Sequence, residues 1–132
     1  MQKTSLLTAI QQLARFGVVG IAATAVHAIV GVFAVYQLKQ GGLSANAIGF
    51  FAAWWVSFFG HYAFTFNGEA DRWQAFLRFL PHSAMMFTIG MAVTGLVSMA
   101  GPQISQSVLP VIGACAVPLL SFISSKFFVF RV

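Results

Sequence analysis

Four long apolar stretches dominate this 132-residue chain, covering residues 16–38, 45–66, 79–100 and 107–130. A helix needs about 20 apolar residues to cross the hydrocarbon core of a bilayer, and each stretch is long enough. With 59% hydrophobic and 7% charged residues, the chain also has too little polar surface to cover a water-soluble core. The sequence therefore predicts an all-α integral membrane protein with four transmembrane helices.

Amphipathic segments precede the first and third stretches. Near residues 4–14, Leu6, Ile10 and Leu13 fall on one face of a helix, and a similar spacing of apolar residues occurs near residues 71–78. Such segments are typical of helices that lie in the membrane interface. We expect two short interfacial helices, one before each of these spans.

The positions of one proline and one asparagine predict local roles at the starts of two helices. Pro81 falls in the first turn of the predicted third span, where a proline costs no helical hydrogen bond. Asn46 falls at the start of the second span, and the simplest interpretation is that its side chain caps that helix.

Basic residues are distributed unevenly between the two sides of the predicted spans. One side carries six of them: Lys3, Arg15, Arg72, Arg78, Lys126 and Arg131. The other side carries Lys39 alone. Loops rich in lysine and arginine remain in the cytoplasm, so we expect both termini to be cytoplasmic. The predicted location is the cytoplasmic (inner) membrane, crossed several times.

The second and fourth stretches end in similar motifs. Residues 57–66 (SFFGHYAFTF) and 121–130 (SFISSKFFVF) both place a polar residue four positions after the first serine, and both close on an aromatic-x-Phe pattern. Arg15-Phe16 likewise matches Arg78-Phe79. We predict two parallel two-helix repeats, related by an axis along the membrane normal. Chance similarity is the alternative, since these residue types are common in apolar chains.

The spans lack the combinations of residues that perform catalysis or bind metals. They contain no carboxylate, no His/Cys cluster at metal-binding spacing and no phosphate-binding glycine loop. We expect no enzymatic activity, no metal and no cofactor. The basic residues occur singly and form no stripe for nucleic acid. A buried acid, which a small proton-coupled exporter needs, is also missing.

Several basic or titratable residues are predicted to lie at similar depth near the cytoplasmic face: Arg15, His61, Arg78, His82, Lys126 and Arg131. Arginine binds phosphate through paired hydrogen bonds, and lysine binds it as a point charge. Together they could surround the phosphate or diphosphate of a lipid headgroup. The alternative is that each is only an anchor at the membrane interface.

His27 lies about a third of the way into the first span, where a titratable group is costly. Two interpretations are open. It is either a neutral packing residue held by a hydrogen bond, or part of a polar passage through the membrane.

The chain resembles the GtrA-like family of small four-span membrane proteins over nearly its whole length. The resemblance rests on Arg15-Phe16-x-x-x-Gly20, on Asn46-x-x-Gly49, on Arg78-Phe79 and on the two motifs at 57–66 and 121–130. The family often has asparagine where this chain has Ser57, Ser121 and Ser125, and arginine where it has Tyr62. Lys126 keeps a basic residue in the second motif, whereas His61 or Tyr62 must replace it in the first.

This resemblance implies translocation (flipping) of a polyprenyl-phosphate-linked sugar across the membrane for cell-surface polysaccharide synthesis. A membrane-bound polyprenyl-phosphate glycosyltransferase is the implied partner. We expect the six residues near the cytoplasmic face to hold the phosphate, with Arg15, Arg78 and Lys126 as its main ligands. The sugar would follow a polar passage along His27, Ser57, Tyr62, Ser121 and Ser125.

The lipid chain would remain among membrane lipids during the crossing. Because so short a bundle could hardly enclose a sugar alone, we expect a homo-oligomer. One alternative is a scaffold that recruits the glycosyltransferase and moves nothing. A small-molecule exporter is a weaker alternative.

Overall fold

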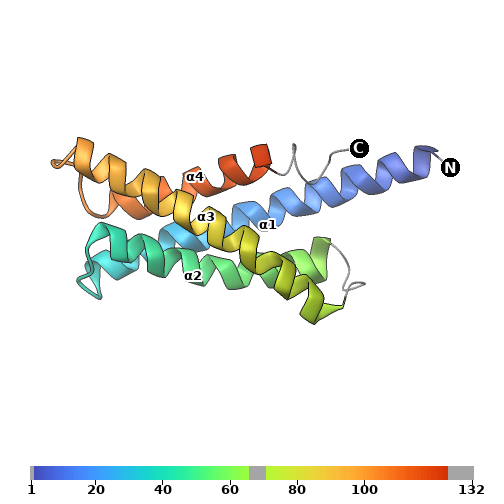
Figure 1. Ribbon diagram of the computed structural model, residues 1–132, viewed down its shortest axis with the longest axis horizontal. Helices are drawn as coiled ribbons and strands as arrows, with labels where there is room; N and C mark the ends of the chain where they lie inside the picture. Colours follow the sequence, from blue (N-terminus) through green and yellow to red (C-terminus); the bar gives the residue numbers. More distant parts are fainter. Residues whose placement is uncertain (1, 66–70, 125–132) are drawn as a thin grey trace.

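The computed structural model describes residues 2–65 and 71–124, which form helices joined by short loops (Figure 1). The elements are α1 (Gln2–Tyr36), α2 (Gly42–Gly60), the π-helical turn η1 (His61–Thr65), α3 (Arg72–Ala100) and α4 (Val108–Ser124). The described residues contain no strand. The predicted all-α fold is therefore confirmed.

Three helices are long and apolar enough to cross a membrane: Leu6–Tyr36, Gly42–Phe64 and Arg72–Ala100. The fourth, α4, has 17 residues. At a rise of about 1.5 Å per residue it measures roughly 26 Å, slightly less than the hydrocarbon core of about 30 Å. The predicted fourth span at 107–130 continues beyond the described residues, so the structure shows three span candidates and one shorter apolar helix.

The two expected interfacial helices are not separate elements. Residues 4–14 continue into α1 without a break, and residues 72–78 form the first turns of α3. Residues 14–16 and 78–79, where these segments meet the predicted spans, contain no glycine or proline to end a helix, and Gly17 and Pro81 just beyond them are accommodated inside α1 and α3. As a result Pro81 lies inside α3, in its third turn, and the prediction of a first-turn proline is wrong.

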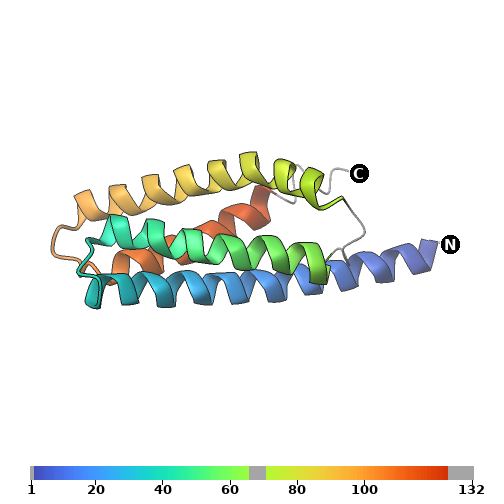
Figure 2. The same ribbon diagram turned by 90° about the horizontal axis from the view of Figure 1, so that it is seen from below.

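The helices alternate in direction along one long axis (Figures 1 and 2). Loops 37–41 and 101–107 meet at one end of the bundle, which we call the loop end. There the Tyr36 hydroxyl donates a hydrogen bond to Ser107 Oγ at 3.3 Å. The C-terminal end of α2 and the N-terminal end of α3 lie at the opposite end. We call this the basic end.

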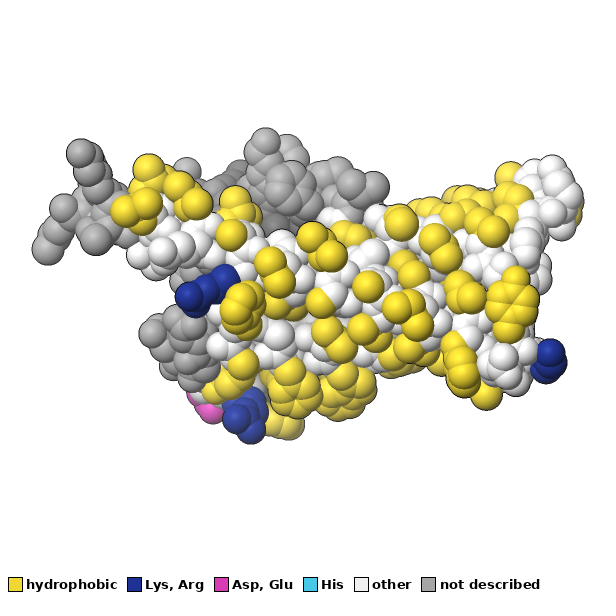
Figure 3. All heavy atoms as spheres, turned by 180° about the vertical axis from the view of Figure 1, so that it is seen from behind, with side chains coloured by type: hydrophobic (Ala, Val, Ile, Leu, Met, Phe, Trp, Pro, Cys, Tyr) yellow, Lys and Arg dark blue, Asp and Glu magenta, His cyan; other side chains and the backbone are white. Residues whose placement is uncertain are grey.

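The surface matches this division. Side chains of lysine and arginine lie toward the two ends, while hydrophobic side chains cover the middle of the face seen in Figure 3. Inside the bundle, α2 contacts each of the other three helices, and so does α4. Residues on α2 can therefore meet side chains from each of the other three helices.

Candidate functional site

Three arginines lie toward the basic end: Arg15 on α1, and Arg72 and Arg78 on α3. Arg72 and Arg78 are exposed, and Arg15 is partly buried. The sequence predicts phosphate binding by Arg15 and Arg78, whereas Arg72 enters only the predicted orientation of the chain in the membrane. Lys39 lies at the opposite, loop end.

Arg15 connects α1 to the end of α2. Its guanidinium donates a hydrogen bond to the backbone carbonyl of Phe64 at 3.4 Å and lies 5.4 Å from the centre of the Phe64 ring. Carbonyls in the last turn of a helix lack helical partners, so a cationic donor is favourable there. This contact fixes the charge of Arg15 beside η1.

The two histidines predicted at this end pack against aromatic rings. The His61 ring stacks on Phe16 of α1, with centroids 4.4 Å apart and an interplanar angle of 18°. The His82 ring, one turn after Arg78 on α3, lies 6.4 Å from the ring of Phe79. Phosphate binding by either histidine remains a prediction.

The remaining predicted residues are only partly described. Ser57 lies on α2 and is partly buried, and Tyr62 lies in η1. The backbone of Ser121 belongs to α4, but its side chain is outside the described part of the chain. The other three lie outside the described residues altogether: Ser125, Lys126 and Arg131.

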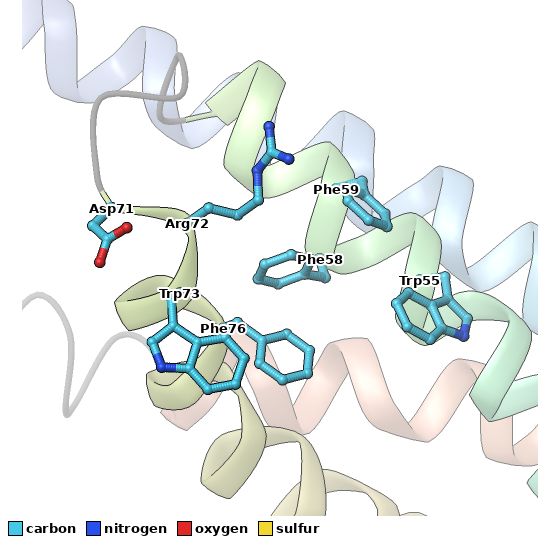
Figure 4. Close-up of a pocket in the computed structure, with 7 residues that line it drawn as sticks. All are labelled: Trp55, Phe58, Phe59, Asp71, Arg72, Trp73 and Phe76. Atoms are coloured by element: carbon cyan, nitrogen blue, oxygen red, sulfur yellow. The ribbon is translucent and has the colours of Figure 1, made fainter.

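A pocket of about 430 Å³ lies between the C-terminal half of α2 and the first turns of α3 (Figure 4). We call it the aromatic groove, and it is lined by Trp55, Phe58, Phe59, Asp71, Arg72, Trp73 and Phe76. Phe58 is buried and meets Phe76 edge to face at 5.4 Å. Trp55 and Trp73 are 51% and 64% exposed. The groove is thus open to the apolar surroundings of the bundle.

One end of the aromatic groove is charged. The Arg72 guanidinium lies 5.4 Å above the ring of Tyr62, whereas the Asp71 carboxylate points in a different direction (Figure 4). Within the described ranges no ion pair joins Asp71 to Arg72. A cation beside an apolar groove is an arrangement that can bind an amphiphile with an anionic head.

A second candidate site, a buried polar cluster, lies nearer the loop end. His27 Nε2 on α1 donates a hydrogen bond to Asn46 Oδ1 on α2 at 2.8 Å. The Asn46 amide nitrogen donates to Thr94 Oγ1 on α3 at 3.4 Å and to Met91 Sδ at 3.3 Å. The Thr94 hydroxyl in turn donates to the Gly90 carbonyl at 2.8 Å. Side chains from α1, α2 and α3 therefore share one network.

Two glycines make room for this cluster. A Cβ atom at Gly113 of α4 would collide with the Asn46 amide, and one at Gly49 would collide with the His27 carbonyl and ring. All four helices therefore meet at Asn46. The packing interpretation of His27 requires such a hydrogen bond, while its place on a polar passage remains a prediction.

The prediction that Asn46 caps α2 is wrong. The helix begins at Gly42 after an extended Gly41, so Asn46 lies in its second turn and points inward. Gln106 from the other loop provides the cap, because its Oε1 accepts a hydrogen bond from the Gly42 backbone N–H at 2.8 Å. The spacing of Asn46 and Gly49, which share one helical face, was the available signal for the buried site.

Comparisons with known proteins assign the family. No curated protein and no solved structure matches the chain. A family model described as GtrA/DPMS, transmembrane domain, matches residues 15–130. This match covers most of the sequence and includes both candidate sites, so the chain belongs to the GtrA/DPMS transmembrane-domain family of membrane proteins.

Proposed function

We propose that this protein translocates a polyprenyl-phosphate-linked sugar across the cytoplasmic membrane, for use in cell-surface polysaccharide synthesis. The observation that carries the proposal is the position of Arg15, Arg72 and Arg78 toward one end of the bundle, whereas hydrophobic side chains cover its middle on the face seen in Figure 3. Family membership supports the same substrate class. The protein supplies binding and passage, with no chemical step.

The proposed topology has four spans and two parallel two-helix repeats. The basic end faces the cytoplasm, because loops with arginine and lysine are retained there. Both termini are then cytoplasmic, and α4 belongs to the proposed fourth span. The loop end, with Lys39, faces the opposite side.

In the proposed mechanism the lipid phosphate first binds at the basic end. Arg15 and Arg78, with Lys126 beyond the described residues, neutralise its charge and donate hydrogen bonds to it. The sugar then crosses while the prenyl chain stays in lipid. A hydroxyl buried without a partner costs about 2–7 kcal/mol, so polar side chains along the way lower the barrier. The polar cluster of His27, Asn46 and Thr94 would serve near the loop end.

Proteoliposomes test this function directly. The purified protein is reconstituted with a fluorescent polyprenyl-phosphoryl sugar, and the fraction in each leaflet is followed with a quencher that does not cross the membrane. We expect the wild-type protein and Lys39→Gln to flip the lipid equally. The double variant Arg15→Gln/Arg78→Gln should be slowed at least about tenfold, as expected for losing charged hydrogen bonds. Equal flipping by the double variant refutes this phosphate site, and no flipping by wild type refutes translocation.

A scaffold for a membrane-bound glycosyltransferase is the second candidate, and α1 favours it. The helix has 35 residues, or about 52 Å, which exceeds the hydrocarbon core of about 30 Å. Its first turns extend beyond the end of α2 (Figure 2). They carry exposed apolar side chains: Leu6, Leu7, Ile10 and Leu13. A surface of this kind suits a partner helix.

Co-purification distinguishes the scaffold from the translocase. A scaffold retains a polyprenyl-phosphate glycosyltransferase from the same membrane and shows no flipping in vesicles. Charged substitutions at Leu6 and Ile10 should then abolish retention. We also propose a homo-oligomer. The same preparation tests it from the mass of the protein complex, after the mass of the bound detergent has been subtracted.

A further inference from the structure

We propose that the aromatic groove binds one polyprenyl phosphate from the side, with the phosphate on Arg72 and the first isoprene units on the aromatic rings. This inference rests on the proposed function and deepens it, because it assigns an entry site on α2 and α3. Arg72 and the groove are distinct from the six residues that the sequence predicts as phosphate ligands.

The walls of the groove suit a hydrocarbon chain. Five of its seven lining residues are aromatic, and they come from two neighbouring helices. Trp55 and Trp73 expose more than half of their surface at the outer rim. A lipid chain could therefore enter sideways from the bilayer without passing through the bundle.

The aromatic rings of the groove are held in place by their neighbours. Trp73 stacks on Phe76 at 5.8 Å with an interplanar angle of 20°, and Trp55 stacks on Phe59 at 6.0 Å with an angle of 17°. Phe58 anchors the floor, since it is 5% exposed. Rings that are held by their neighbours lose little further freedom when a ligand binds, which favours affinity.

Arg72 is oriented to bind a phosphate. Its guanidinium lies over the face of the Tyr62 ring, at 5.4 Å from the ring centre. A cation–π contact of this kind engages the charge of the guanidinium and no hydrogen-bond acceptor, so its N–H donors stay available for paired hydrogen bonds to phosphate oxygens. The Asp71 carboxylate is directed away from this position (Figure 4).

The size of the groove favours a lipid with a single chain. Its volume of about 430 Å³ is in the usual range for a small-ligand site. The groove lies between one pair of helices and offers one path for a chain. A two-chain phospholipid would leave its second chain without a matching surface there, so we commit to polyprenyl phosphate as the occupant.

Photo-crosslinking tests the inference on the full chain in phosphatidylcholine nanodiscs. The probe is a polyprenyl phosphate with a diazirine in its second isoprene unit, and the labelled peptides are identified by mass spectrometry. We expect labelling of α2 and the first turns of α3, with competition by unlabelled polyprenyl phosphate. Phosphatidic acid, which also carries a phosphate monoester, should compete at least tenfold less well.

Substitutions in the groove test which side chains contact the probe. Arg72→Gln should raise the half-saturating probe concentration about tenfold, because a charged hydrogen bond is lost. Phe76→Leu should also weaken labelling, while Lys39→Gln at the loop end should leave it unchanged. Thermal melting curves establish that each variant is folded.

Three outcomes overturn the inference: labelling outside the groove, equal competition by phosphatidic acid, or full labelling of Arg72→Gln. The flipping assay separates this inference from the proposed function. Flipping without labelling of the groove refutes the entry site and leaves translocation intact. Labelling of the groove without flipping supports the entry site and refutes translocation.

Discussion

His27 Nε2 and Asn46 Oδ1 lie 2.8 Å apart and join α1 to α2 in the interior of the bundle. The two residues are 3% and 2% exposed. Because the Asn46 oxygen accepts a hydrogen, the Nε2 atom of His27 carries one in this arrangement. The Asn46 amide then has its two N–H groups available for Thr94 and Met91. The network is directional, and each donor in it has an acceptor.

Replacing Asn46 should loosen this contact among the helices. Asn46→Ala removes the acceptor of His27 and the donor to Thr94, leaving polar atoms buried without partners. Hydrogen bonds between membrane helices contribute about 0.6–2 kcal/mol each, so we expect a loss of about 1–3 kcal/mol in the free energy of unfolding. Unfolding in a denaturing detergent measures it. Ser44→Ala, an exposed position one helical half-turn earlier, is the control, and equal stability of the two variants contradicts the prediction.

The glycine facing this cluster offers a matched pair of variants. A Cβ at Gly113 collides with the Asn46 amide, whereas one at Gly95 meets only Leu43 Cδ2, at a van der Waals distance of 4.0 Å. We expect Gly113→Ala to cost about 1–3 kcal/mol by overpacking. Gly95→Ala should be neutral or stabilising, because alanine favours a helix by about 0.5–1 kcal/mol over glycine. Thermal melting of both proteins in one detergent decides the order, and the reverse order refutes this packing.

The fold class could be predicted because hydropathy depends on local composition. Apolar stretches at 16–38, 45–66 and 79–100 correspond to the three span candidates. In lipid, a helix is the conformation in which such a stretch can form all the hydrogen bonds of its backbone N–H and C=O groups within itself. The helix starts were harder to predict. Residues 4–14 and 71–78 look interfacial by their spacing, yet nothing at their junctions ends a helix.

The candidate sites depended on packing, which the sequence does not display. Asn46 looks like a cap when α2 is considered alone, and its burial depends on Gly113, far along the chain on α4. From the sequence, Arg72 only indicates which side of the membrane its loop occupies. In the structure, α3 places its side chain over the Tyr62 ring and in the same groove as Phe58. The grouping of Arg15 with the end of α2 was predictable. Arg15 lies at the start of the first predicted span and the end of α2 lies at the end of the second, so both fall on the same side of the membrane.

Gln106 should contribute to stability through the start of α2. Gln106→Leu removes the acceptor of the buried Gly42 N–H, and loss of a helix cap costs about 0.5–2 kcal/mol. Gln103→Leu is the control, because Gln103 is an exposed residue in the same loop. Hydrogen exchange of the first turn of α2 should accelerate in Gln106→Leu only. Equal exchange in both variants would contradict the assigned cap.

Tyr62 should support lipid binding through its ring, which lies beneath the Arg72 guanidinium at 5.4 Å. A cation–π contact at an exposed site contributes about 0.5–1 kcal/mol, so Tyr62→Leu should raise the half-saturating concentration of the diazirine probe about two- to fivefold. Tyr62→Phe keeps the ring and should bind the probe as wild type does. The same variant tests the predicted polar passage, because it removes only the hydroxyl. Normal probe binding with slower flipping in Tyr62→Phe would assign the hydroxyl to the passage, whereas weakened probe binding in Tyr62→Phe would contradict the role given to the ring.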